Sequence, residues 1–402
     1  MNAIQPRRAL IATHHLAGYA GSEVFTLELA AELREMGWEV CVAALLIGEP
    51  MMSEFNKRGL RIVDMLTESS VLSNAKFDLA WVHHSPVLYE LLLRKIEAVT
   101  LVFCSLSHFE PLEAVPDCPD SVDLLLAHSI ENKNHIVNST GWSGHQVHVF
   151  PNAVPGSYWA HAKAASSPSL KRMAIISNHP PAELLQAAQA LRKDGIEVAH
   201  IGAGGLQLLV DADFLCRYDT VVSIGKTVPY CLALKIPVYC YDHFGGPGWL
   251  HEGNLDLASQ NNFSGRGFPQ KTAQAIALEI TGGYHESLGR LNRHATLAAN
   301  TFDLRKNLAL LLSRPEVSPG KKRADPDTMP ALKQHAQYIR LAKLMRDREA
   351  EVEGLRKEIS RVKSTLSWRL ASPFRVARNF LRRIIGLRLH QQGKHLDSRP
   401  QK

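Results

Sequence analysis

The chain has 402 residues, 45% of them hydrophobic, and a formal net charge of +7. This length is long for a single core and predicts two domains with additional segments. No run of roughly eighteen or more uncharged apolar residues is present, so no transmembrane helix is expected. The N-terminus lacks the long apolar region of a signal peptide, and the six cysteines have no Cys-x-x-Cys spacing. Buried free thiols in a reducing cytoplasm are therefore predicted.

The charge is divided unevenly along the chain. Residues 1–312 contain 24 Lys and Arg against 30 Asp and Glu, a balance of −6. Residues 313–402 contain 22 against 9, a balance of +13. The basic excess therefore belongs to the C-terminal tail and predicts an anionic partner for it, either a membrane surface or a nucleic acid.

Residues 7–150 alternate between patterns typical of buried strands and of helices. The expected strands are Ala9–Thr13, Glu39–Leu46, Leu79–Val82, Val99–Phe103 and Leu124–Ala127. The expected helices include Ser22–Met36, Pro86–Lys95 and Ile130–Ser139. Such alternation implies a parallel sheet with right-handed crossovers, and it predicts a Rossmann-like domain over residues 1–160.

A polar stretch of small residues, Trp159–Leu170, then interrupts the pattern and predicts an interdomain linker. The alternation restarts with expected strands at Met173–Ser177, Glu197–Ile201, Thr220–Ile224 and Ile236–Tyr241. The expected helices are Pro181–Arg192, Pro269–Thr281 and Glu286–Leu312. A second Rossmann-like domain is predicted over residues 171–312, and two doubly wound domains place the largest cleft between them.

The segment Tyr218–Trp249 carries the clearest chemical signal. A buried strand leads into Gly225, Lys226 and Thr227 at a helix start, and a glycine- and aromatic-rich loop follows the next strand. Such a helix start offers backbone N–H groups, a positive dipole end and an ammonium to a phosphate. Thr220 stands where a P-loop requires its first glycine, which excludes a P-loop NTPase. A nucleotide is the expected ligand, and a solvated lysine beside a plain turn is the alternative.

Two other turns at strand ends are candidate ligand contacts. Gly21 and Ser22 would let backbone amides approach a ligand after the first strand. Ser177, Asn178 and His179 close the first strand of the second domain, where a phosphate or ribose contact and a plain capped turn are both open.

Several histidines and acids lie near the strand ends of the first domain: His83, His84, His108, Glu110 and Glu113. They show no recognisable ligand spacing for zinc, so no metal site is predicted. One of them would serve as acid or base, or orient a sugar hydroxyl. His84, His108 and Glu110 are the candidate catalytic residues, and the sequence does not choose among them.

The composition changes after Ser313. Residues 313–332 are rich in proline and charge and predict a flexible linker. An apolar series with steps of three and four then predicts a coiled coil over residues 333–366 and a homo-oligomer, with a single helix docked on the body as the alternative. The series is Tyr338, Leu341, Met345, Arg348, Val352, Leu355, Ile359, Val362 and Leu366.

Residues 367–390 contain large apolar side chains and arginines but no acidic residue. This pattern predicts a basic amphipathic helix that lies on an anionic membrane surface. A nucleic-acid arm would contain fewer large apolar residues, so no nucleic-acid partner is expected.

Several stretches resemble motifs of one enzyme family: GSEVFTLELAAELREMGWEVCVA (Gly21–Ala43), FDLAWVHHS (Phe77–Ser85), AHSIENKNHI with VHVFPNAVP (Ala127–Pro155), SNHPP, IGKT, YDHFGGPGW and Ser-Trp-Arg-Leu-x-x-Pro-x-Arg (Ser367–Arg375). On these motifs the chain resembles GT-B-fold glycosyltransferases, particularly the family-4-like enzymes of bacterial surface polysaccharide biosynthesis. The resemblance implies a nucleotide-sugar donor held mainly by the second domain, an acceptor that approaches the first, and no separate cofactor.

Carried over by position, the resemblance also implies donor-site residues. Tyr230 and Val222 occupy the positions of the two glutamates usual in the family, so the ribose-binding carboxylate would come from elsewhere, with Asp242 and Glu252 as candidates. The donor-binding candidates are Gly21, Ser22, Ser177, Asn178, His179, Gly225, Lys226, Thr227, Tyr230, Asp242, His243, Gly245 and Gly246.

The sequence thus predicts a cytoplasmic glycosyltransferase, peripheral to the inner membrane, that acts on a polysaccharide or lipid-linked acceptor. No divalent metal is expected, because amides and Lys226 can stabilise the leaving diphosphate. The main alternative is an inactive GT-B scaffold that recruits partners through its coiled coil, which the missing glutamates favour. A sugar-nucleotide epimerase of the same architecture would not need the basic tail.

Overall fold

The structure is a computed structural model that describes residues 6–116, 119–162, 167–314 and 329–365. Most of the predicted linker 313–332 and all of the predicted basic helix 367–390 lie outside these residues. The chain forms two compact units, Met1–Ala336 and Gln337–Lys402. Among the described residues, no helix is both long and apolar enough to cross a membrane.

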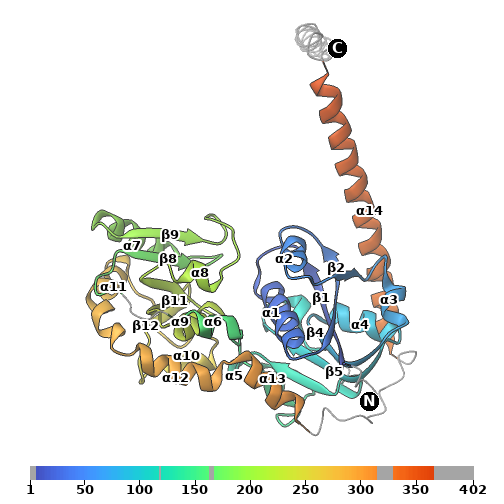
Figure 1. The fold of residues 1–402 in the computed structure, drawn as a ribbon, viewed down its shortest axis with the longest axis horizontal. Helices are drawn as coiled ribbons and strands as arrows, with labels where there is room; N and C mark the ends of the chain where they lie inside the picture. Colours follow the sequence, from blue (N-terminus) through green and yellow to red (C-terminus); the bar gives the residue numbers. More distant parts are fainter. Residues whose placement is uncertain (1–5, 117–118, 163–166, 315–328, 366–402) are drawn as a thin grey trace, which may run out of the picture. The chain divides into compact units, whose positions relative to one another are not determined.

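The first sheet has seven parallel strands in the order β3-β2-β1-β4-β5-β6-β7. Figure 1 labels β1, β2, β4 and β5 of this sheet. The strands are β1 (Arg8–Leu16), β2 (Glu39–Ile47), β3 (Ile62–Asp64), β4 (Lys76–Val82), β5 (Glu97–Ser105), β6 (Leu124–Ala127) and β7 (Val147–Val149). Its helices are α1 (Gly21–Glu35), α2 (Met51–Lys57), α3 (Ser69–Ser73), α4 (Ser85–Leu93) and α5 (Ile130–Ser139). The strand order is that of a doubly wound α/β domain.

The second sheet has five strands in the order β12-β11-β10-β8-β9. They are β8 (Arg172–Ile176), β9 (Glu197–Ile201), β10 (Thr220–Ser223), β11 (Val238–Asp242) and β12 (Gly245–Trp249). All neighbours pair in parallel except β12, which runs antiparallel to β11. The helices are α6 (Gly156–Ala160), α7 (Ala182–Lys193), α8 (Ala212–Leu215), α9 (Thr227–Leu234), α10 (Leu255–Gln260), α11 (Ala273–Leu288) and α12 (Leu291–Thr301). The prediction of two doubly wound domains is confirmed.

The expected ligand loop after β11 is wrong in part, because its glycines form strand β12. A Cβ on Gly246 would lie 2.2 Å from the Cys240 carbonyl oxygen, and one on Gly245 would lie 2.5 Å from that of Pro269. Both glycines are therefore required by close backbone packing at the edge of the sheet.

The closing helices also differ from the prediction of one helix over Glu286–Leu312. The chain breaks at Gly289 and again at Asp303, whose carboxylate accepts the Lys306 N–H (2.9 Å) and caps α13 (Leu304–Leu312). Helix α13 then packs its leucines into the core of the first sheet, beside Leu33 and Phe150. The chain thus returns to the first sheet after completing the second.

The C-terminal tail begins as one long helix, α14 (Pro330–Ser364), which confirms a helical tail. Its first turns belong to the first unit, where the His335 Nε2 lies 3.1 Å from a Glu90 carboxylate oxygen of α4. The pairing of this helix with another helix stays a prediction.

Candidate functional site

Each sheet has a topological switch point, and the chain places polar residues at both. In the first sheet it lies between β1 and β4, whose ends lead to His15 and His84. In the second it lies between β8 and β10, whose ends lead to Ser177 and Lys226. Ligands of open α/β sheets bind at such crevices, beyond the carboxyl ends of the strands.

Two adjoining cavities lie at these strand ends. Cavity A, of about 620 Å³, is lined by the turn 18–21, by residues 176–179 and by Ser223, Lys226, Thr227, Tyr230, Asp242 and His243. Cavity B, of about 450 Å³, is lined by His15, Gly21, Ser22, His84, Ser107, Glu110, Glu113, Asn152, Lys226 and Asn262. They share Ala20, Gly21 and Lys226, so the start of α1 and one ammonium border both. Cavity volumes of this size suit small-molecule ligands.

Lys226 is held firmly in the wall between the cavities. Its ammonium forms an ion pair with Glu28 of α1 (2.6 Å) and donates to the Ala153 carbonyl (3.2 Å). It also lies 5.0 and 5.3 Å from the ring centroids of Phe25 and Tyr230, within cation–π range. Because an ammonium has three N–H donors, one remains for an anion in either cavity.

Glu28 is a functional candidate that the sequence analysis missed. One carboxylate oxygen pairs with Lys226, and the other accepts a hydrogen bond from the Tyr230 hydroxyl. Burial raises the pKa of Glu28, and the nearby Lys226 ammonium opposes that rise. The only sequence signal for Glu28 was its place between Leu27 and Leu29 in an expected helix. Both leucines are buried in the structure.

Tyr230 has a different role from the glutamate usual at its position. Its ring stacks on Tyr158 with a centroid distance of 4.2 Å, and its side chain is almost fully buried. The hydroxyl donates to Glu28, so the carboxylate at this place comes from α1 rather than from α9.

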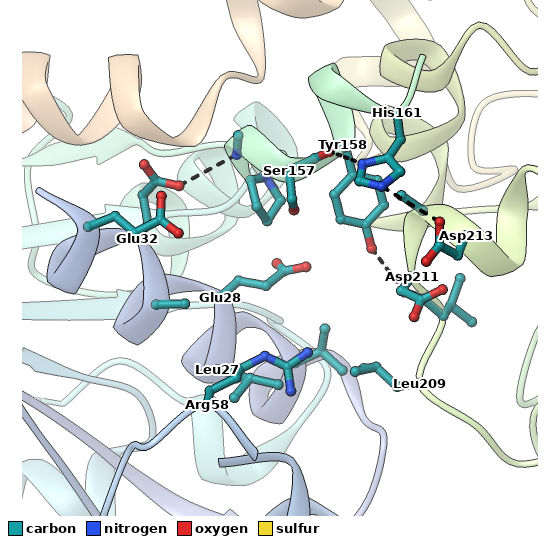
Figure 2. Close-up of a pocket in the computed structure, with 17 residues that line it drawn as sticks. Leu27, Glu28, Glu32, Arg58, Ser157, Tyr158, His161, Leu209, Asp211 and Asp213 are labelled. Carbon is teal, nitrogen blue, oxygen red and sulfur yellow. Dashed lines mark hydrogen bonds and ion pairs between the residues drawn. The ribbon is translucent and has the colours of Figure 1, made fainter. Parts of the chain in front are cut away.

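A third cavity, of about 220 Å³, is lined by Glu28 and is unsuited to phosphate (Figure 2). Figure 2 shows the Glu28 side chain reaching from α1 into this cavity, toward Tyr158. The cavity is lined by the carboxylates Glu28, Glu32, Glu35, Asp211 and Asp213, and among the described lining residues Arg58 is the only Lys or Arg. Such an excess of negative charge repels an anionic ligand.

The glycine turn at the start of α1 is organised by Glu23. This buried carboxylate accepts the N–H groups of Ala17 (2.6 Å), Gly18 (2.8 Å) and Ala20 (2.9 Å). Three amides of the turn are therefore occupied, and the two residues that open the helix, Gly21 and Ser22, line the cavities.

We expect Glu23→Gln to destabilise the protein by about 1.5–3 kcal/mol, because an amide replaces a charged acceptor of three buried hydrogen bonds. Urea denaturation would measure the change. Glu35→Gln, at an exposed position of the same helix, serves as the matched control. Glu35 has an exposed ion pair with Arg305 (3.1 Å), so its replacement should cost less than about 1 kcal/mol. Equal stabilities for the two variants would contradict this role of Glu23.

The remaining predicted donor residues divide between ligand-facing and structural positions. Ser177, Asn178, His179, Thr227, Asp242 and His243 line cavity A. Asn178 also accepts the Ala203 N–H (3.1 Å), which fixes the neighbouring loop. The Gly225 N–H donates to the Asn262 carbonyl (3.1 Å) and is not available to a phosphate. Glu252 pairs with Arg293 at an exposed position and does not line the cavity.

Asp242 is the only carboxylate among the described residues that line cavity A. It is 5% exposed, and one oxygen accepts the Phe244 N–H at 2.8 Å. The second oxygen leaves an acceptor for ligand hydroxyl groups at the end of β11.

Cavity B brings His84 and Glu113 together. The His14 backbone N–H donates to the His84 Nδ1 (3.2 Å), which assigns the ring proton to Nε2. That Nε2 lies 3.7 Å from a Glu113 carboxylate oxygen, and the other oxygen of Glu113 is buried without a hydrogen-bond partner among the described residues. Burial raises the pKa of Glu113 to about 8 and lowers the pKa of His84 to about 2.

The other catalytic candidates occupy different surroundings. Glu110 lines cavity B at an exposed position. His108 lines neither cavity and stacks on His135 with a centroid distance of 4.7 Å. Among the described residues, no group of three or more His, Cys, Asp and Glu is placed to hold a metal ion.

Solved structures similar to this chain include glycosyltransferases. A glycosyltransferase from Rickettsia africae ESF-5 matches over 76% of this chain and 98% of its own, with a TM-score of 0.50 and 13% identity. TarM matches over 78% and 99%, with a TM-score of 0.53 and 9% identity. An alpha-glucosyltransferase in complex with UDP and a 13-mer DNA matches over 78% and 100%, with a TM-score of 0.51 and 10% identity.

Because the identities are low, these similarities establish the fold alone. The chain has the two-domain GT-B fold, as the sequence predicted. No protein-family model matches the sequence, and the comparison with curated proteins gives no significant match.

Proposed function

We propose that the protein is a glycosyltransferase that moves a sugar from a nucleotide donor to a hydroxyl group of a saccharide or lipid-linked acceptor. The observation that carries this proposal is the position of Lys226 and the α1 start, which border both cavities at the strand ends of the two sheets. A diphosphate held there would lie between a nucleotide in cavity A and an acceptor in cavity B.

The charges support this arrangement for the donor. The α1 start contributes the backbone amides of Gly21 and Ser22 and the positive end of the helix dipole, and Lys226 contributes an ammonium. Both would stabilise the negative charge that develops on the leaving diphosphate as the glycosidic bond breaks. Asp242 would accept hydrogen bonds from the ribose hydroxyl groups. It would thereby take the role of the family's glutamate, whose position Tyr230 occupies here.

Glu113 is the group in cavity B best suited to accept the proton that an acceptor hydroxyl loses. One oxygen of its buried carboxylate has no hydrogen-bond partner among the described residues, and the His84 Nε2 lies 3.7 Å from the other oxygen. A base with a pKa near the working pH is the most effective proton acceptor. Metal-independent transfer remains part of the proposal, since these side chains and amides can perform both tasks.

An acceptor on a lipid carrier is consistent with the basic residues 367–390, which are outside the described part of the chain. A segment that contacts anionic lipid would keep the two cavities near a membrane-bound acceptor. The bacterial, inner-membrane and polysaccharide assignments rest on this sequence pattern and on the resemblance.

Binding of nucleoside diphosphates tests the function directly. We expect calorimetry with UDP, GDP, ADP and TDP to detect one that binds, and thermal denaturation with the matching nucleotide sugars to identify the donor. A ligand present at 100 times its Kd should raise the free energy of unfolding by about 2.7 kcal/mol. Absence of binding by all of them would contradict the proposal and favour the inactive scaffold.

A further inference from the structure

We infer that α14 binds the same helix of a second copy of the chain, as a parallel two-stranded coiled coil in register. This inference concerns the second unit and is independent of the proposed activity. Beyond Ala336, seven large apolar side chains of this helix are between 45% and 57% exposed. They are Leu341, Leu344, Met345, Val352, Leu355, Ile359 and Val362. Exposed apolar surface of this extent marks a binding surface.

The heptad positions of these side chains favour two parallel strands. Tyr338, Met345, Val352 and Ile359 occupy the described a positions. Leu341, Leu355 and Val362 occupy the d positions, with Arg348 at the remaining d position. Branched residues at a combined with leucine at d are typical of parallel dimers.

The flanking charges determine the orientation. Glu351 and Glu358 occupy g positions, and Arg356 and Lys363 occupy the e positions five residues after each of them. In a parallel pair, each g residue faces the following e residue of the other helix, so the contacts of Glu351 with Arg356 and of Glu358 with Lys363 both join opposite charges. In an antiparallel pair, g faces g, and the two glutamates would face glutamates.

The single charged core position determines the register. In register, Arg348 faces its copy in one polar layer, beside Glu349 of the second helix, and every other described layer stays apolar. A shift by one heptad would place each Arg348 against an apolar residue and disrupt two layers. One polar layer of this kind sets register at a cost in stability.

Interactions within one helix do not compete with this arrangement. Arg348 pairs with Glu351 at 2.8 Å and Arg356 with Glu353 at 4.0 Å, and all four side chains are more than half exposed. Exposed pairs of this kind contribute at most about 1 kcal/mol. They can exchange for contacts between helices without a large cost.

Sedimentation and disulfide formation in the full-length protein test the oligomer and its orientation. We expect a dimer, and we expect oxidised Val362→Cys protein to form a covalent dimer that the parent chain does not form. In an antiparallel pair, residue 362 would lie near residue 345 instead, about 26 Å from its own copy. A disulfide only in the double variant Met345→Cys/Val362→Cys would overturn the parallel orientation, and a monomer would overturn the pairing.

Charge reversal separates contacts between helices from effects within one helix. We expect Glu351→Lys/Glu358→Lys to weaken the dimer at least tenfold, and added Arg356→Glu/Lys363→Glu to restore it. Residues five apart are not neighbours on one helix, so restoration requires contacts between copies. Arg348→Leu should tighten the dimer. If the glutamate substitutions weakened the dimer and the added substitutions at Arg356 and Lys363 did not restore it, the proposed g–e pairing would be wrong.

Discussion

Replacement of Lys226 by alanine should abolish measurable nucleoside diphosphate binding and lower kcat/KM by about 10²–10³, the loss typical of one electrostatic group at a transition state. The same change should destabilise the protein, because it leaves Glu28, whose side chain is only 12% exposed, beside Tyr230 without its cation. Breaking one partner of a buried pair costs about 3–5 kcal/mol. Activity alone would therefore not distinguish a lost ligand contact from a damaged fold.

The double variant Lys226→Ala/Glu28→Gln separates these two effects. The neutral amide can still accept the Tyr230 hydroxyl, so we expect urea denaturation to show that most of the lost stability returns. Donor binding, measured by calorimetry, should remain absent, because the ammonium is still missing. Recovery of binding together with stability would show that Lys226 acts only by holding α1 and α9 together.

Lys193→Ala provides the matched control. This lysine lies at the exposed end of α7 and lines neither cavity. It carries the same charge, so a general effect of the protein's net charge on an anionic ligand would appear in this variant as well. We expect donor binding within a factor of two of the parent chain.

The sequence predicted the elements whose signal is local. Leu124–Ala127 and Glu197–Ile201 became strands with the expected bounds, since each is a short segment with apolar residues between turns. The helix at Ile130–Ser139 likewise matches its prediction, and its Ser129 cap accepts the Asn132 N–H (3.1 Å). Periodicity and capping residues are sufficient for elements of this kind.

The contacts that define the site could not be predicted in the same way. Tyr230 and Glu28 are 202 residues apart and meet only because two separately folded sheets place α9 beside α1. Likewise, nothing local distinguishes a glycine that binds a ligand from Gly246, which a neighbouring carbonyl oxygen requires. The motif at Gly225 predicted an anion site, which stays a prediction, and the Gly225 amide donates to the carbonyl of Asn262 in another loop.

The protonation of Glu113 should control the pH dependence of transfer. With a pKa raised to about 8 by burial, this carboxyl is mostly protonated at pH 7 and becomes a base as the pH passes 8. We expect kcat/KM of the parent chain to rise with pH and to level off above about 8. Glu113→Gln should lower the plateau by about 10²–10⁴ and remove the rise, as loss of a general base does.

The same ionisation gives an independent measurement that requires no substrate. The folded protein retains the Glu113 proton up to a pH of about 8, whereas the unfolded chain releases it near the ordinary value of 4.5. Unfolding therefore releases a proton between these values, and the contribution of Glu113 to stability falls as the pH rises through this window. Urea denaturation at pH 5 and pH 8 should show a smaller fall for Glu113→Gln than for the parent chain.

Two comparisons assign the titration to Glu113. The pKa of His84 is lowered to about 2, so this neighbour stays neutral throughout the window and cannot produce a rise near pH 8. Glu97→Gln, at the exposed opposite end of β5, should leave both pH profiles unchanged. If Glu113→Gln retained the rise in kcat/KM but lost the stability difference, the carboxyl would titrate as inferred without accepting the acceptor's proton. If Glu113→Gln kept both the rise in kcat/KM and the stability difference, the raised pKa would belong to another group.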